Sequence, residues 1–207
     1  MKLWSDSWND GERIPPQYAC GRLGDQGPTF SDNLNPHLAW SGLPAGTKSL
    51  VLVCHDPDVP SRGDDVNQPD REVPADLPRV DFFHWVMVDI PAGVSAIDEG
   101  EYSRGFTPRG KQGPATLHGA RHGLNDYTGW FASDPERSGQ YFGYDGPFPP
   151  FNDSLLHHYV FTLHALSVER LAVEGAFTGQ QVRQAMAGKV LDQAALSGIY
   201  TLNRRLA

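Results

Sequence analysis

Five polar side chains of the types that bind anions or move protons stand at the ends of three apolar segments: Asp56, Asp58, His84, His157 and Tyr159. Imidazole and phenol groups donate hydrogen bonds to a small oxyanion, and a neighbouring carboxylate fixes the tautomer of a histidine or raises its pKa. Together these residues would suit a pocket for a phosphate-like ligand. Each also has a structural explanation, because the Asp-Pro-Asp sequence can form an Asx-type turn and a single histidine on an apolar face is often a core residue.

The three apolar segments are predicted to be β-strands that bring these side chains together. Residues 49–55 are apolar on both faces, as in a central strand that is covered on each side. Residues 82–90 and 158–166 are rich in β-branched and aromatic residues. With a period of two, His84 is predicted to share a face with Val86, Val88 and Ile90.

The two adjacent histidines before Tyr159 are predicted to face in opposite directions. Alternation puts His157 and Tyr159 on one face of the strand and His158 on the other, so only His157 can line a pocket with Tyr159. The preceding turn has the sequence GPFPP at residues 146–150, and its prolines, Pro149 among them, exclude a helix or a central strand. A rigid loop that leads polar rings to the start of a buried strand is typical of a small-ligand site.

The composition favours a mainly β, acidic protein. A chain of 207 residues is long enough to bury one full core, and we expect a single domain over residues 1–207. The 22 Gly and 17 Pro indicate many turns rather than a helical bundle. The net charge of −8 repels phosphate backbones at long range, so nucleic acid is not an expected partner.

From the sequence we expect neither an export signal nor a membrane anchor. The N-terminus lacks the apolar region of a signal peptide, and no apolar run reaches the about 18 residues of a membrane span. We therefore expect a cytoplasmic protein without stable membrane insertion. Cys20 and Cys54 form no disulfide framework, and Cys54 lies in an apolar run where a buried free thiol is expected.

Two long regions are predicted to be irregular. Residues 61–80 form a polar loop, which could be a lid or a plain surface insertion. Residues 91–143 are punctuated by glycines. His118 and His122 are four residues apart within them, but the adjacent glycines disfavour a helix, so we interpret this stretch as a surface loop rather than a metal site.

The C-terminal region shows the pattern of short helices. Thr178 and Gln181 have the spacing of a capping box, and Gly188 is a plausible stop for the helix that they begin. A second short helix is predicted over residues 190–196, followed by a short strand or extended tail at residues 198–202.

The order of these motifs resembles the phosphatidylethanolamine-binding protein family, also called the Raf kinase inhibitor protein family, and most closely its bacterial members. The resemblance covers roughly residues 36–166 and lies in the sequences NPHLAW at residues 35–40, PAGTKS at 44–49, DPDVP at 56–60, His84-Trp85, YDGPFPP at 144–150 and HHYVF at 157–161. It implies a sandwich of two antiparallel sheets with short C-terminal helices. It also implies a small pocket for phosphate-like anions or phospholipid headgroups.

By this resemblance Asp56 matches the family's pocket aspartate and His84 its first pocket histidine. His157 and Tyr159 match the outer members of a His-Arg-Tyr triplet, while Asp58 and Pro149 line or brace the site. His158 departs from the triplet because the family usually has arginine there, so an ion pair expected at this position would be absent or weaker. The loop at residues 61–80 and the segment at 132–140 look longer than in short bacterial members.

Three functions are compatible with these residues. We expect a protein that binds a small anionic ligand without turnover and without a cofactor, since the common sequence motifs of hydrolases, nucleotide-binding loops and zinc proteases are missing. The alternatives are a regulatory module whose ligand gates binding to a protein partner, and an enzyme that uses the same His and Asp residues for acid–base or metal chemistry. A homodimer is also compatible with a β fold that exposes sheet edges.

Overall fold

The computed structural model describes residues 1–207 and is mainly β, as the sequence predicts. Two short α-helices and two 3₁₀ turns are the only helical elements: α1 (Tyr127–Trp130), α2 (Gly179–Ala185), η1 (Pro16–Tyr18) and η2 (Leu117–Gly119). The strands are β1 (Lys2–Trp4), β2 (Gly21–Gly24), β3 (Gly27–Phe30), β4 (Leu38–Ser41), β5 (Ser49–Pro60), β6 (Arg79–Pro91), β7 (Ala96–Ile97), β8 (Arg121–His122), β9 (His157–Leu166) and β10 (Val190–Tyr200).

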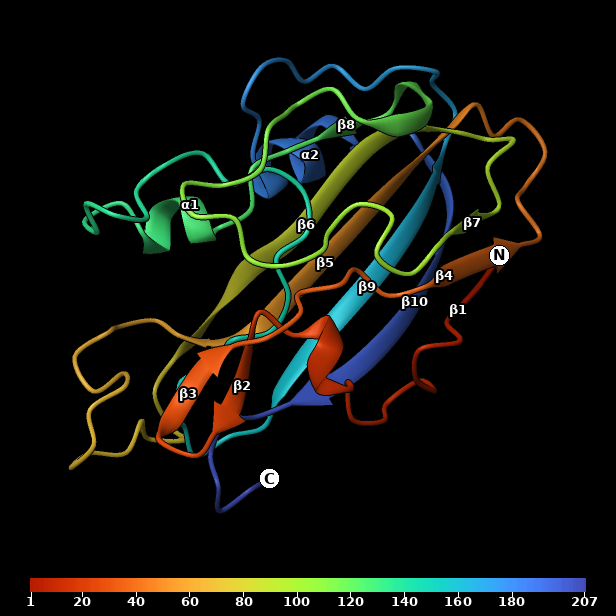
Figure 1. The fold of residues 1–207 in the computed structure, drawn as a ribbon. Helices are drawn as coiled ribbons and strands as arrows, with labels where there is room; N and C mark the ends of the chain where they lie inside the picture. The colour runs from red at the N-terminus through yellow and green to blue at the C-terminus, as the bar shows by residue number, and fades with distance from the viewer.

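A five-stranded antiparallel sheet, in the order β10-β9-β5-β6-β8, forms the centre of the molecule. A three-stranded antiparallel sheet, in the order β1-β4-β7, covers one of its faces, and β2 and β3 pair as a separate hairpin. In Figure 1 the long strands run diagonally, with α2 and β8 near one end and the β2–β3 hairpin and the C-terminus near the other.

Strand β5 is central because apolar side chains cover both of its faces. Leu50, Leu52 and Cys54 belong to a buried cluster shared with β1, β4, β6, β9 and β10. Val51 and Val53 belong to a second cluster on the opposite face, which Val182 of α2 and the helix's C-cap residue Met186 close. Burial of two apolar faces is the driving force that holds this strand in the middle of the sheet.

His84 does not share a face with Val86 and Val88, so that part of the prediction was wrong, whereas Ile90 packs in the cluster that contains Tyr159. The register between β5 and β6 changes here: Cys54 pairs with Trp85, but the next residue, His55, pairs with Phe83. His84 is therefore the extra residue of a β-bulge, which a strict period of two cannot anticipate. The bulge re-aims His84 toward the face that carries Tyr159, while Val86 and Val88 pack in the second cluster.

The predicted helix at residues 190–196 is also wrong, because this segment is the first part of β10. β10 pairs with β9 along its length, from Val190 opposite Leu166 to Tyr200 opposite His157. Cross-strand pairing outweighs the helix propensity of the alanines and leucines in this stretch. The preceding helix α2 is confirmed, with the capping box of Thr178 and Gln181 complete in both directions.

His122 is not part of a surface loop. It lies in β8 with 5% of its surface exposed, and its Nε2 accepts a hydrogen bond of 3.3 Å from Nε1 of Trp85. Burial, with a smaller contribution from the charge of Lys111, lowers its pKa to about 3. His118 is exposed and does not share this site. No helix of the structure combines the length and the apolar character that crossing a membrane requires.

Candidate functional site

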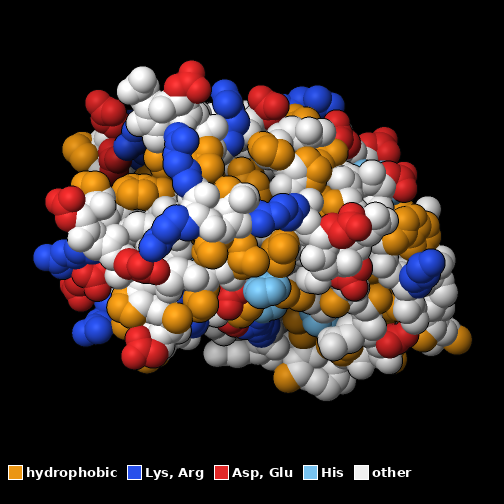
Figure 2. Space-filling model, turned by 90° about the horizontal axis from the view of Figure 1, so that it is seen from below, with side chains coloured by type: hydrophobic (Ala, Val, Ile, Leu, Met, Phe, Trp, Pro, Cys, Tyr) orange, Lys and Arg blue, Asp and Glu red, His pale blue; other side chains and the backbone are white.

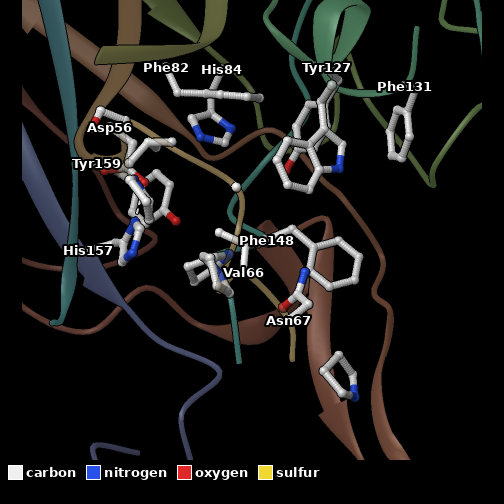
Figure 3. A pocket seen from close by; sticks show the side chains of 18 of the residues that line it. Asp56, Val66, Asn67, Phe82, His84, Tyr127, Phe131, Phe148, His157 and Tyr159 are labelled. Atoms are coloured by element: carbon white, nitrogen blue, oxygen red, sulfur yellow. Dashed lines mark hydrogen bonds and ion pairs between the residues drawn. The ribbon is translucent and has the colours of Figure 1, made fainter. Parts of the chain in front are cut away.

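A pocket of about 490 Å³ lies at the end of the large sheet where β5 finishes and β6 and β9 begin. Antiparallel pairing of β6, β5 and β9 explains why residues so distant in sequence meet there. Five of the six residues predicted to form the site line this pocket: Asp56, His84, Pro149, His157 and Tyr159. Figure 3 shows Asp56, His157 and Tyr159 together on one side, with His84 next to them.

His157 is held between two carboxylates and has no free ring nitrogen. Its Nδ1 lies 2.6 Å from Oδ2 of Asp56, and its Nε2 lies 3.1 Å from Oδ2 of Asp153. Arg79 continues the series with a bidentate pair to Asp153, at 2.6 and 3.1 Å. Because a carboxylate can only accept, both nitrogens of His157 carry hydrogens and the ring is an imidazolium.

The carboxylates keep His157 charged in spite of its burial. Burial lowers the pKa of the ring, but the hydrogen bonds and charges of Asp153 and Asp56 outweigh burial and raise the pKa to about 9. The two carboxylates and two cations of this series balance each other. The series therefore has no net charge, and two of its members, Asp56 and His157, line the pocket.

His84 offers the pocket a hydrogen-bond acceptor. Its Nδ1 donates to the carbonyl oxygen of Asp145 at 2.8 Å, and since a carbonyl cannot donate, the hydrogen is on Nδ1. Burial lowers the pKa of His84, with the charge of Asp56 opposing it only in part. The ring is neutral, and Nε2 keeps its lone pair. This arrangement differs from the expectation that both histidines donate to a ligand.

Asp145 supports the pocket through His84, and the sequence analysis did not single it out. Its carboxylate is buried and accepts from Asn33 at 2.8 Å, Asn125 at 2.9 Å and Lys111 at 2.6 Å. The backbone N–H of Asp145 donates to the carbonyl of His84 at 3.1 Å. Two hydrogen bonds to the backbone of Asp145 therefore hold His84. Asp145 thereby fixes both the position and the tautomer of His84. Its place in the YDGPFPP motif was the only signal in the sequence.

The Tyr159 hydroxyl is a buried polar group without a hydrogen-bond partner in the structure. The side chain is 1% exposed, and its ring stands edge-on to His84 with 5.1 Å between the centroids. Burial, followed by the charge of Asp56, raises the pKa of Tyr159 well above 10, so the phenol remains a donor. The Asp56 carboxylate is close enough to contribute a weak contact to this shift, but it makes no hydrogen bond of ordinary length and angle with the hydroxyl. A buried hydroxyl that makes no hydrogen bond destabilises the free protein.

The long loop after β5 forms another wall of the pocket, through Ser61, Val66 and Asn67 among others. Asn152, next to the proline turn, holds this loop: its Nδ2 donates to the carbonyls of Asp65, Gln68 and Arg71, and its Oδ1 accepts from the N–H of Asn67. The loop is therefore an ordered part of the pocket wall rather than a plain surface insertion.

The sequence model of the family described as phosphatidylethanolamine-binding protein matches residues 4–201. The chain belongs to this family. The protein YbhB of Escherichia coli strain K12 is 31% identical over 182 residues, which are 88% of this chain and 88% of that protein. A UPF0098 protein of Methanothermobacter thermautotrophicus is 32% identical over 200 residues, which are 97% of this chain and 98% of that protein.

Solved structures of the phosphatidylethanolamine-binding protein family share this fold. E. coli YbcL, described as a new member of the mammalian family, superimposes with a TM-score of 0.68 at 25% identity and covers 97% of each chain. The putative homologue CT736 from Chlamydia trachomatis superimposes with a TM-score of 0.64 at 28% identity, over 96% of this chain and 95% of that chain. The predicted fold and the resemblance to bacterial members are both confirmed.

Asp58, the sixth predicted residue, does not line the pocket. Its Oδ2 accepts from the backbone N–H and from Nδ1 of His158, each at 2.8 Å, on the outer face of β9. The residue that replaces the family's usual arginine therefore still pairs with the second aspartate, and it faces away from Tyr159 as alternation predicts. The expected Asx-type contact is present too, since the N–H of Asp58 donates to Oδ1 of Asp56 at 2.8 Å. Asp58 braces the site.

Proposed function

We propose that this protein binds a small anionic ligand, of the phosphate or phosphate-ester type, in the pocket between β5, β6 and β9. The observation that carries the proposal is the Tyr159 hydroxyl, which is buried at the pocket floor without a partner. A ligand oxygen would accept its hydrogen and remove the cost of the unmade bond. Family membership supports a ligand of this class, because the family's description names a phospholipid, which contains a phosphate ester.

The charges around the pocket favour an anion. The only lining carboxylate, that of Asp56, is occupied on both oxygens by the N–H of Asp58 and Nδ1 of His157. Arg62 and Arg137 lie at the rim. In Figure 2 Lys and Arg side chains stand among hydrophobic groups, with a histidine exposed near the middle of the face. Arg137 is paired with Asp134 at 2.6 Å, whereas Arg62 has no ion-pair partner, so an anion near this rim would meet the positive charge of Arg62 before it reached the floor of the pocket.

The proposal is one of binding without turnover. His157 would be the natural proton carrier, but both of its nitrogens are in hydrogen bonds to carboxylates. A group held in this way stabilises the charge pattern of the floor rather than exchanging protons with a ligand.

Isothermal titration calorimetry with inorganic phosphate tests the proposal. Binding that Tyr159→Phe weakens by about tenfold, as expected for a lost hydrogen bond to a charged group, supports it. Wild-type protein that releases no heat with phosphate, and shows no chemical-shift change at the backbone of residues 157–161, would contradict it.

A further inference from the structure

The pocket has two halves of different chemistry. Figure 3 shows Asp56, His157 and Tyr159 on one side, and Tyr127 and Phe131 on the other. His84 joins the halves, because its ring contacts both Tyr159 and Tyr127, with centroid distances of 5.1 and 5.6 Å. The second half is lined almost entirely by aromatic side chains: Phe30, Phe82, Tyr127, Trp130, Phe131 and Phe148.

The aromatic half is built as a fixed surface. Tyr127 and Phe131 are stacked, at 5.7 Å between centroids and 17° between planes. The Tyr127 hydroxyl donates to the carbonyl of Gly146 at 2.9 Å, which ties this wall to the proline turn. Trp130 differs from its neighbours, because 50% of its surface is exposed and it makes none of their ring–ring contacts. An exposed indole at the mouth of a pocket is a free stacking surface.

The volume of the pocket exceeds what a phosphate ion needs. At the ~30 Å³ that one water-sized group occupies in a liquid, the five heavy atoms of phosphate fill roughly 150 Å³. The pocket measures about 490 Å³. The remaining space faces the aromatic half, so the ligand should carry a further group that fits there.

The charges disfavour an ammonium group in that space. An aromatic cage can bind a cation, but it does so best with an unpaired carboxylate nearby. Asp56 has both oxygens engaged. The guanidinium of Arg137, which pairs with Asp134 at 2.6 Å, lies 5.9 Å from the ring centroids of Phe30 and Phe131. A cationic substituent would compete with this guanidinium for the faces of Phe30 and Phe131, whereas a neutral flat ring would stack beside it.

The floor favours phosphate over carboxylate. Tyr159 offers one donor, and the neutral His84 offers one acceptor through Nε2. A carboxylate can only accept, so it would leave Nε2 facing a negative oxygen. A phosphate monoester with its second pKa near about 6 can retain one O–H group, which donates to Nε2 while another oxygen accepts from Tyr159.

We infer that the pocket binds a phosphomonoester whose phosphate is attached to a neutral, flat ring, with the phosphate between Tyr159 and His84 and the ring against Tyr127, Phe148 and Trp130. This inference rests on the proposed function and narrows its ligand class. It predicts a preference against the ethanolamine headgroup that the family's description names.

Calorimetry at pH 6.5 with three probes tests the inference: phenyl phosphate, phosphoethanolamine and inorganic phosphate. Phenyl phosphate is expected to bind at least tenfold more tightly than either of the others. Trp130→Ala should weaken phenyl phosphate by about fivefold, in the range of a lost aromatic contact, and leave inorganic phosphate unchanged. Leu117→Ala is the matched control, because Leu117 is 49% exposed and lies outside the pocket.

The outcomes distinguish the ring inference from the proposed binding of an anion. Equal affinity for the three probes, or tighter binding of phosphoethanolamine, overturns the ring inference and leaves anion binding in place. A ring preference that Trp130→Ala does not reduce overturns the assignment of the ring to this wall. If none of the three probes binds, the proposed function fails together with the inference.

Discussion

Oδ2 of Asp56 lies 2.6 Å from Nδ1 of His157, and this contact divides the two pocket histidines into different roles. His157 gives both of its hydrogens to carboxylates and holds the floor together. His84 gives its only hydrogen to the Asp145 carbonyl and keeps a lone pair for a ligand. Two residues that look equivalent in the sequence are thus a structural cation and a neutral acceptor.

Removal of His157 should destabilise the fold strongly. In His157→Leu the carboxylates of Asp56 and Asp153 would lose a buried cation, and breaking a buried pair in this way costs about 3–5 kcal/mol. Urea unfolding followed by circular dichroism measures the loss. His118→Asn is the control, because His118 is exposed and its positive φ of 57° suits asparagine. A loss of unfolding free energy below about 1 kcal/mol would show that the buried ion pairs of His157 with Asp56 and Asp153 contribute little to stability.

The contribution of His157 to the unfolding free energy should decrease as the pH rises. Its pKa is raised from 6.5 to about 9 in the folded protein, so its stabilisation is complete below pH 6.5 and disappears as the pH rises through 9. At about 1.4 kcal/mol per pKa unit the change is roughly 3 kcal/mol. The stability difference between wild type and His157→Leu should therefore shrink over this range. A stability difference that does not change with pH would contradict the assignment of His157 as a buried imidazolium.

Much of this site could be predicted from the sequence because it depends on local alternation. The opposite directions of His157 and His158 follow from strand geometry, and β9 contains no bulge that would disturb them. The order of the motifs along the chain was enough to indicate the family.

Other features depend on tertiary contacts that have no local signature. The bulge that re-aims His84 is visible only in the register with β5. Asp153 and Asp145 act through partners distant in sequence, Arg79 and Lys111. β10 forms because β9 offers it a partner strand, although its own sequence also suits a helix.

The loop at residues 61–78 should become mobile when Asn152 is changed to alanine. This substitution removes four hydrogen bonds between the Asn152 side chain and the loop backbone. Hydrogen–deuterium exchange should become faster in residues 63–73, with a loss of about 2 kcal/mol from buried groups left unpaired. Asn9→Ala, which removes one exposed contact with Glu12, serves as the control. Unchanged exchange in the loop would show that other contacts hold it.

Anion affinity should fall as the pH rises, because the acceptor on His84 requires a protonated ligand oxygen. Burial holds His84 neutral, so phosphate should bind more tightly at pH 6 than at pH 8. Sulfate is the matched probe, since it has the same shape but carries no O–H group in this range. Sulfate should bind at least tenfold more weakly than phosphate at pH 6. Equal binding of the two anions would mean that Nε2 of His84 does not accept from the ligand.

The most direct test of the account compares Tyr159→Phe with wild type in stability and in phosphate binding. Tyr159→Phe removes a hydroxyl that has no partner in the free protein, so the unfolding free energy should stay the same or rise by up to about 1 kcal/mol. The same substitution should weaken phosphate binding by about tenfold, because the ligand is the partner of that hydroxyl. A variant that loses stability while it binds phosphate as well as wild type would contradict the central claim.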